Sequence, residues 1–164
     1  VPAANLLGEE NKGFRIAMAG LDGGRIGIAS QAVGIAEAAL QESLALFAAR
    51  PESDPFGDRE MADFRLAEMA TKIDAARLLV ERAAAAKDAG KPHTREAAMA
   101  KLFASQTANE ATREAVALAG RAGISGRNGV ERLLRDARIT ELYEGTTEIQ
   151  KLVISRQILG EGAA

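Results

Sequence analysis

Apolar residues recur at intervals of three and four positions along most of the chain, which is the period of an amphipathic helix. The stretches between the turn signals are rich in alanine, which has the highest helix propensity, and poor in β-branched runs. These patterns predict helices over about 12–49, 58–89, 94–119 and 130–138, and a last one after 145. No segment shows the alternation of apolar and polar residues that would predict a β-strand instead. The sequence therefore predicts an all-α, antiparallel up-and-down helical bundle.

The predicted connections follow from glycine, proline and capping residues. Pro51 and Pro55 require a loop between the first two helices, and the Gly90-Lys91-Pro92 run ends the second. The sequence also predicts three finer features: an interruption of the first helix at Leu21–Arg25, an N-cap at Thr94, and an irregular loop through the glycines at 120, 123, 126 and 129. Thr147-Glu148-Ile149-Gln150 has the pattern of a capping box.

The predicted core consists of the large apolar residues on each helical stripe. They are Val33, Leu40, Leu44 and Phe47, then Phe64, Met69, Ile73, Leu79 and Ala83, then Met99, Leu102, Phe103, Val116 and Leu118, and finally Ile149, Leu152, Val153 and Leu159.

Composition narrows the class of protein. The 164 residues are 47% hydrophobic with a formal net charge of -2, and the 21 basic and 23 acidic residues are interspersed, so we expect no nucleic-acid partner. No apolar run approaches the roughly 20 residues of a membrane span, and no charged and apolar leader opens the chain. We therefore expect a cytoplasmic protein. With no cysteine and one histidine, His93, neither a disulfide nor a metal site is expected.

The most distinctive candidate for chemistry is Tyr143-Glu144-Gly145-Thr146-Thr147. It places a carboxylate immediately before a helix N-terminus, where backbone N–H groups lack partners. The carboxylate can act as a base, while free amides and the helix dipole can polarise an oxygen that gains negative charge. That combination suits removal of a proton next to a carbonyl. The alternative is a surface glutamate that only complements the helix dipole.

Asp22 and Arg25 stand three residues apart beside the glycine pair, so both can project from one side of a helix. Arg25 could hold a carboxylate or phosphate, and Asp22 could accept a proton. The alternative is a surface ion pair of little energetic weight. The glycine-rich segment from Gly120 could bring amides close to a phosphate, or be only a flexible loop. A di-iron bundle is excluded because it needs two Glu-x-x-His pairs.

The order of several short motifs closely resembles the acyl-CoA dehydrogenase family over essentially the whole chain. The motifs are Asn5-Leu6-Leu7-Gly8, Gly13-Phe14, Leu21-Asp22-x-x-Arg25, Gln31-Ala32-x-Gly34-Ile35-Ala36, Leu66-Ala67-Glu68-Met69-Ala70, Val130-Glu131-Arg132-x-x-Arg135-Asp136-Ala137-Arg138-Ile139 and Tyr143-Glu144-Gly145-Thr146. The resemblance implies that residues 1–12 are the tail of a preceding β domain and that residues 13–164 are the C-terminal helical-bundle domain.

The resemblance also implies a reaction. Glu144 would remove the α-proton of an acyl-CoA thioester while FAD takes the β-hydrogen, giving a trans-2-enoyl-CoA. Asp22, Arg25, Tyr143 and Gly145 match positions beside the substrate. Some relatives place the catalytic glutamate at the position of Gly24, so Glu144 has no competitor here.

The cofactor and partners are implied in the same way. Thr146 and Glu148 match positions near the adenosine half of FAD. Arg50, Phe56 and Gly120 match positions that reach the FAD of a neighbouring subunit, which implies a homotetramer built as a dimer of dimers. An electron-transfer flavoprotein would be the electron acceptor.

Three departures from the family pattern bear on the shared flavin. The spacing from Arg50 to Phe56 is lengthened, the stretch before Leu66 is shortened, and Ala117 and Arg121 replace a glutamine and a glycine. Two alternatives therefore stay open: an acyl-CoA oxidase relative, and a non-catalytic helical module for oligomerisation. We expect the isolated 164-residue chain to be inactive, because the other domains would supply contacts to the flavin and substrate.

Overall fold

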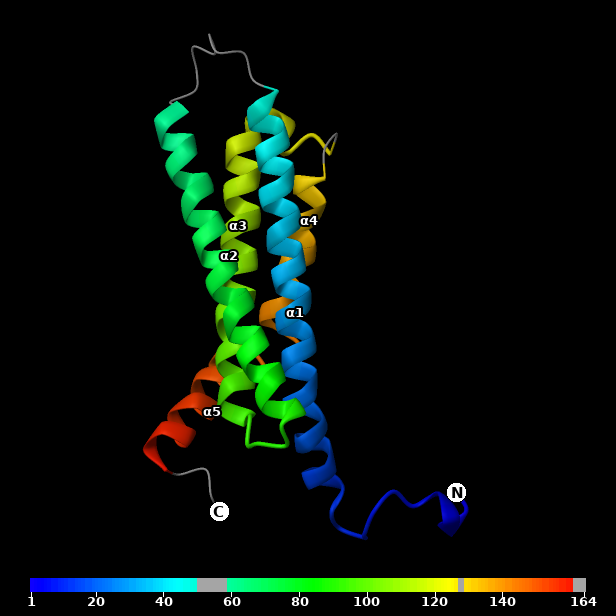
Figure 1. Cartoon of the computed structure of the whole chain (residues 1–164). Helices are drawn as coiled ribbons and strands as arrows, with labels where there is room; N and C mark the ends of the chain where they lie inside the picture. The colour runs from blue at the N-terminus through cyan, green and yellow to red at the C-terminus, as the bar shows by residue number, and fades with distance from the viewer. Residues whose placement is uncertain (50–58, 127–128, 161–164) are drawn as a thin grey trace.

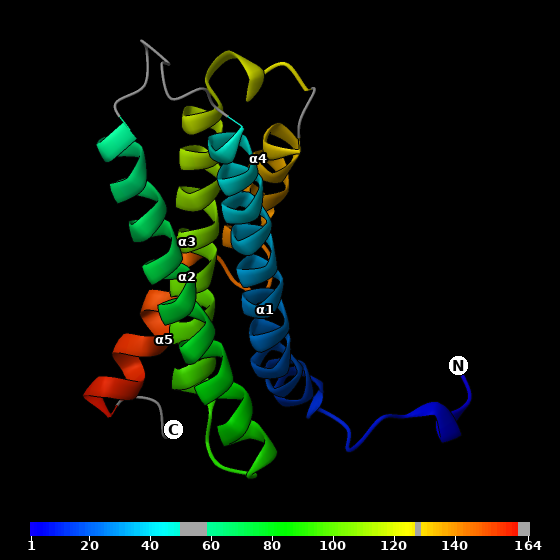
Figure 2. The ribbon, with the colours of Figure 1, turned by 45° about the horizontal axis from the view of Figure 1, so that its top comes forward.

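The computed structural model describes residues 1–49, 59–126 and 129–160. Its elements are η1 (Ala3–Asn5), α1 (Gly13–Ala48), α2 (Arg59–Asp88), α3 (Thr94–Ala119), η2 (Gly120–Ala122), α4 (Val130–Arg138), η3 (Ile139–Glu141) and α5 (Thr147–Leu159), with no strand in these ranges. The helices α1 to α4 run alternately up and down, and the shorter α5 packs against the lower part of α3 (Figures 1 and 2). The predicted all-α antiparallel bundle is confirmed.

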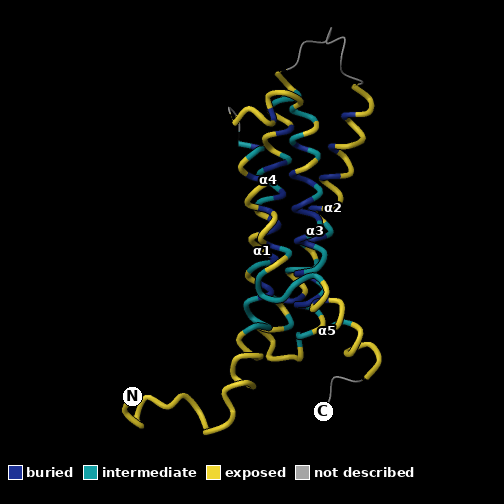
Figure 3. Tube along the Cα trace, turned by 180° about the vertical axis from the view of Figure 1, so that it is seen from behind, coloured by how far each residue is buried: buried dark blue, intermediate teal, exposed yellow. Residues whose placement is uncertain are grey.

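The core is built mainly from alanine. On α3 the fully buried alanines follow helical spacing at positions 97, 100, 104, 108 and 115, and on α1 they lie at 29, 32, 36 and 39. Residues three and four apart share a helix face, so these two rows face each other where α1 packs along α3. Figure 3 shows the buried positions as a stripe on each of the long helices. Small side chains allow close approach of the helices, and larger residues close the flanks.

The predicted core was correct where the large apolar residue adjoins an alanine row. Val33, Met69, Ile73 and Ala83 are buried. Leu44 and Phe64, however, are 42% and 58% exposed, so their assignment to the core was wrong. Periodicity shows that a helix has an apolar stripe, but several stripes were available on each helix. Which stripe faces inward is decided by the alanine rows, because they permit the closest packing.

The predicted buried face of α5 was also wrong. Within the described structure Ile149, Leu152 and Leu159 are 43%, 43% and 69% exposed, whereas the polar Gln150 is completely buried. Gln150 faces inward because its side-chain amide donates hydrogen bonds to backbone carbonyl groups of the preceding turn. The apolar residues are left on the outer side of the helix.

The interruption predicted at Leu21–Arg25 is absent, since α1 is continuous from Gly13 to Ala48. Two glycines cost roughly 1 kcal/mol each within a helix. They are tolerated here because they permit close contacts: a Cβ at Gly23 would lie 2.9 Å from Nζ of Lys87, and one at Gly24 would collide with the carboxylate of Glu144. The glycine pair makes room for neighbours and does not break the helix.

Two predicted caps also differ from the structure. The N-cap of α3 is His93, and Thr94 is the first helical residue, whose Oγ1 donates a hydrogen bond to Oδ2 of Asp22 at 2.7 Å. The N-cap of α5 is Thr146, one residue before the start of the predicted capping box. Gln150 cannot close that box because its side chain is engaged with the turn.

The short helix α4 and the loop before it agree with the sequence. Nε of Arg135 donates to Glu131 at 2.6 Å, and Arg132 pairs with Asp136 at 3.9 Å, both at the predicted spacing. Residues 120–126 form η2 and turns. Residues 1–12 are all exposed and extend away from the bundle (Figure 1). Their origin in a β domain stays a prediction. No described helix combines the length and apolarity needed to cross a membrane.

Candidate active site

The turn between η3 and α5 has an unusual backbone. Glu144 has φ +53° and Gly145 has φ +92°, two successive residues in the left-handed region. For a residue with a side chain, such as Glu144, this conformation costs about 1–2 kcal/mol. It persists only where surrounding contacts impose it, and such strain clusters at functional sites.

Two buried polar side chains hold this turn. Nε2 of Gln150, from α5, donates to the carbonyl oxygens of Glu144 at 3.1 Å and of Gly145 at 2.9 Å. Nζ of Lys101, from α3, donates to the same Gly145 oxygen at 2.7 Å. Both side chains are 0% exposed. Sequence reasoning missed both residues. The available signal was a polar residue on an otherwise apolar stripe: Lys101 follows the buried Ala97 and Ala100.

The carboxylate of Glu144 reaches across to α1. It lies against Gly24, where an added Cβ would be 2.7 Å from Cδ of Glu144. Its Oε2 is buried and has no hydrogen-bond partner within the described ranges. A buried acceptor left without a partner costs about 1–3 kcal/mol, so it calls for an explanation. An oxygen that must accept a proton from a bound molecule has to be free in this way.

The predicted pair of Asp22 and Arg25 is formed, and it is not the surface pair that was the alternative. Nη1 of Arg25 donates to Oδ1 of Asp22, and the two side chains are only 7% and 20% exposed. Thr94 completes the group from α3 by donating to the other Asp22 oxygen. Nε of Arg25 is buried without a partner in the described part of the chain. Through Thr94 the pair therefore joins α1 to α3 directly beside Gly24.

Replacing Asp22 with asparagine is expected to destabilise the fold by about 2–4 kcal/mol, because it leaves the buried Arg25 guanidinium without its counter-charge. Urea unfolding measures this free energy. Asp136→Asn is the matched control, since Asp136 is half exposed and pairs with Arg132 at 3.9 Å. The control is expected to change stability by less than about 0.5 kcal/mol. Equal effects of the two substitutions would contradict the assignment of a buried pair.

The remaining predicted residues around the turn lie on its outer side. The Tyr143 hydroxyl donates to Oε1 of Gln31, which ties the turn to α1. Thr146 caps α5, and Glu148 lies exposed in its first turn. The backbone N–H of Glu148 and then the Thr146 hydroxyl lower the pKa of the Glu148 carboxyl. The structure thus brings together Asp22, Arg25, Tyr143, Glu144, Gly145, Thr146 and Glu148, all seven predicted from the sequence.

Comparison with known proteins decides the family. The profile described as "Acyl-CoA dehydrogenase, C-terminal domain" matches residues 11–159. The chain belongs to the acyl-CoA dehydrogenase family. It is 52% identical over 160 residues to the probable acyl-CoA dehydrogenase YngJ of Bacillus subtilis (strain 168), covering 97% of this chain and 42% of that protein.

Solved structures give the same result. Butyryl-CoA dehydrogenase from Megasphaera elsdenii superimposes with a TM-score of 0.93 at 49% identity. A structure described as the electron transferring flavoprotein of Acidaminococcus fermentans superimposes with a TM-score of 0.94 at 48% identity. Each comparison covers 97% of this chain and 42% of the other. The chain therefore spans less than half the length of these relatives and corresponds to their C-terminal helical domain.

Gly120, which was predicted to approach the cofactor of a neighbouring subunit, lies far from the Glu144 turn. Gly120 ends α3, at φ +57°, while Lys101 lies near the start of that helix. Their separation of 19 positions along the chain corresponds to about 28 Å of helix. Arg50 and Phe56 fall outside the described residues. The role of Gly120 stays a prediction.

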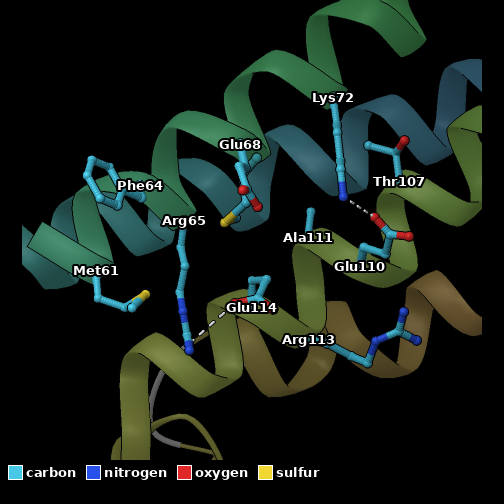
Figure 4. Close-up of a pocket in the computed structure, with 11 residues that line it drawn as sticks. Met61, Phe64, Arg65, Glu68, Lys72, Thr107, Glu110, Ala111, Arg113 and Glu114 are labelled. Carbon is cyan, nitrogen blue, oxygen red and sulfur yellow. Dashed lines mark hydrogen bonds and ion pairs between the residues drawn. The ribbon is translucent and has the colours of Figure 1, made fainter. Parts of the chain in front are cut away.

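A hollow of about 440 Å³ between α2 and α3 lies apart from the Glu144 turn. Figure 4 shows that charged side chains bridge it: Lys72 reaches Glu110 at 2.7 Å and Arg65 reaches Glu114 at 3.5 Å. The hydrogen bond and negative charge of Glu110 raise the pKa of Lys72. Such a lining does not suit an acyl chain. Across the described ranges, no three His, Cys, Asp or Glu side chains are grouped as metal ligands.

Proposed function

We propose that the complete protein catalyses the FAD-dependent α,β-dehydrogenation of an acyl-CoA thioester to trans-2-enoyl-CoA, with Glu144 as the base. The observation that supports this most directly is the free Oε2 of Glu144, buried against Gly24 on a strained turn at the start of α5. A carboxylate held without a partner suits proton removal from carbon.

The chemistry assigned to this chain is the removal of one proton. The α-C–H bond breaks, its proton passes to Oε2 of Glu144, and the electron pair left on carbon forms the new double bond as the β-hydrogen departs. A bound FAD would supply the acceptor for that hydrogen and its electron pair. The negative charge that develops on the thioester oxygen is stabilised by backbone N–H groups of the turn and the positive end of α5.

The residues present fit a flavin on the outer side of the turn. Thr146 and the first turn of α5 offer a hydroxyl and backbone N–H groups, which suit hydroxyls or phosphate oxygens. The exposed Ile149 and Leu152 adjoin them and would be covered in the complete protein. We propose that Thr146 and Glu148 face the adenosine half of FAD, and that Asp22, Arg25, Tyr143 and Gly145 border the substrate.

We extend the proposal to the assembly and the electron acceptor. The family resemblance implies a homotetramer in which Arg50, Phe56 and Gly120 approach the cofactor of a neighbouring subunit. The same resemblance implies an electron-transfer flavoprotein as the electron acceptor. The similarity to butyryl-CoA dehydrogenase makes butyryl-CoA the first substrate to test.

The test is the visible spectrum of the complete protein before and after anaerobic addition of butyryl-CoA. A flavin band that bleaches is the expected result. A flavin band that persists with every acyl-CoA tried would contradict the dehydrogenase assignment, and a protein purified without flavin would favour the helical module. Reoxidation by oxygen as fast as by an electron-transfer flavoprotein would identify the oxidase alternative.

A further inference from the structure

Lys101 is a buried lysine that the reaction described above does not use. Its side chain is 0% exposed and lies on the alanine-lined face of α3, next to the buried Ala100 and Ala104. Burying an ammonium group is costly unless it is paired and hydrogen-bonded, so lysine is almost never found fully buried without a specific reason. Its Nζ donates a hydrogen bond to the carbonyl oxygen of Gly145.

Packing alone does not explain a lysine at this position. An unbranched apolar side chain of similar length would fill the space without the cost of burying a charge, and such replacements are often neutral or stabilising. The Gly145 oxygen does not depend on Lys101 either, because Gln150 already donates to it at 2.9 Å. A buried cation in addition to that amide points to a role for the ammonium itself.

The charged groups around Lys101 come from every element that meets at the turn. Glu141 belongs to η3, Glu144 to the turn and Glu148 to α5, and Arg25 comes from α1. Burial lowers the pKa of Lys101, and Arg25 acts in the same direction, while the three glutamates oppose this shift. The ammonium is therefore surrounded by charged groups of both signs from α1, η3, the turn and α5.

We propose that Lys101 is a positioning residue for the base, holding the strained turn and its carboxylate in place through the Gly145 carbonyl and through its charge. This inference rests on the proposed function, because it takes Glu144 to be the base. All described peptide bonds are trans, so each C=O points opposite to the N–H of its peptide. Fixing the Glu144 and Gly145 oxygens toward Gln150 and Lys101 therefore directs the N–H groups of Gly145 and Thr146 away from them.

The experiment uses the complete flavoprotein and compares Lys101→Met with Lys91→Met, an exposed lysine in the turn before α3. Anaerobic stopped-flow measures the rate of flavin reduction against butyryl-CoA concentration. We expect Lys101→Met to lower the limiting rate by about 10- to 100-fold, as small displacements of reacting groups do. Half-saturation should change by less than about threefold, flavin content should be unchanged, and Lys91→Met should match the unmodified protein.

Glu144→Gln in the same experiment separates the two hypotheses. If Glu144→Gln abolishes reduction while Lys101→Met reduces flavin at the normal rate, the positioning role is wrong and the proposed function stands. If Glu144→Gln reduces flavin normally, the proposed function itself is wrong. A loss of rate in Lys101→Met that only parallels lost flavin or a lower melting temperature would indicate a structural role and overturn the inference.

A second readout does not depend on activity. Because burial lowers the pKa of Lys101, the unfolded state binds more protons than the folded state between that lowered pKa and 10.5. Stability contributed by this group therefore rises with pH across that window, and Lys101→Met is expected to remove the rise. Should Lys101→Met fail to fold, Lys101→Gln provides a neutral donor, and a normal reduction rate in that variant would overturn the need for a cation.

Discussion

Glu144→Gln in the complete flavoprotein is expected to slow flavin reduction by butyryl-CoA about 10²- to 10⁴-fold, the usual contribution of a general base. The amide keeps the shape of the side chain but cannot accept the α-proton. Substrate binding should persist, because the backbone of the turn is held by Gln150 and Lys101 and not by the carboxylate. Stopped-flow reduction measures the rate, and titration with a non-reducing acyl-CoA analogue measures the binding.

Glu131→Gln is the matched control for this substitution. Glu131 lies on α4, and its carboxylate accepts two hydrogen bonds from the Arg135 guanidinium on the surface. The control is expected to reduce flavin at the normal rate. The assignment of Glu144 as the base would be rejected if Glu144→Gln and Glu131→Gln were reduced at similar rates.

Gly145→Ala is also expected to slow flavin reduction strongly, because it would displace the turn that carries Glu144. At φ +92° a Cβ strains the backbone, and it would lie 2.7 Å from Nε2 of Gln150, within collision distance. The turn must then shift, which moves the carboxylate of Glu144. We expect a loss of stability of about 2 kcal/mol and a fall in the flavin reduction rate of about 100-fold. Thermal unfolding and stopped-flow reduction measure the two effects.

Gly90→Ala is the control for Gly145→Ala, because it introduces the same kind of backbone strain without a collision between the added Cβ and a neighbouring side chain. Gly90 lies in the turn after α2 at φ +64°, and nothing lies within 4 Å of an added Cβ. Its substitution should cost about 1 kcal/mol of stability while leaving flavin reduction unchanged. A Gly145→Ala variant that reduces flavin as fast as Gly90→Ala would show that the turn tolerates displacement.

The sequence placed the proposed base correctly relative to the helices. Glu144 precedes a helix N-terminus, and Asp22 and Arg25 lie on the same side of α1, as their spacing indicated. This was possible because helix ends, turns and i,i+3 pairs are local features that depend on a few neighbouring residues. The order of the motifs also sufficed to indicate the family, which the comparisons confirm.

The residues that contact the Glu144 turn from other helices could not be predicted from local sequence patterns. Lys101 is 43 residues before Glu144 in the chain, and Gly24 is 120 residues before it, so their contacts depend on how α1 and α3 pack. From the local sequence alone, a pair of glycines predicts an interruption of the helix. Only the neighbouring carboxylate shows that Gly24 makes room for Glu144.

Taken by itself, the sequence determined the helices, their order and the position of the carboxylate, because helical periodicity and turn chemistry act over short distances. The tertiary structure decided which stripes are buried: rows of alanine in place of Leu44 and Phe64, and Gln150 in place of Ile149. The physical reason is that burial depends on how closely two helices approach and on which polar groups need a partner. The distance between two helices and the partner of a polar group each depend on two segments of the chain. Neither can therefore be predicted from the sequence of one segment alone.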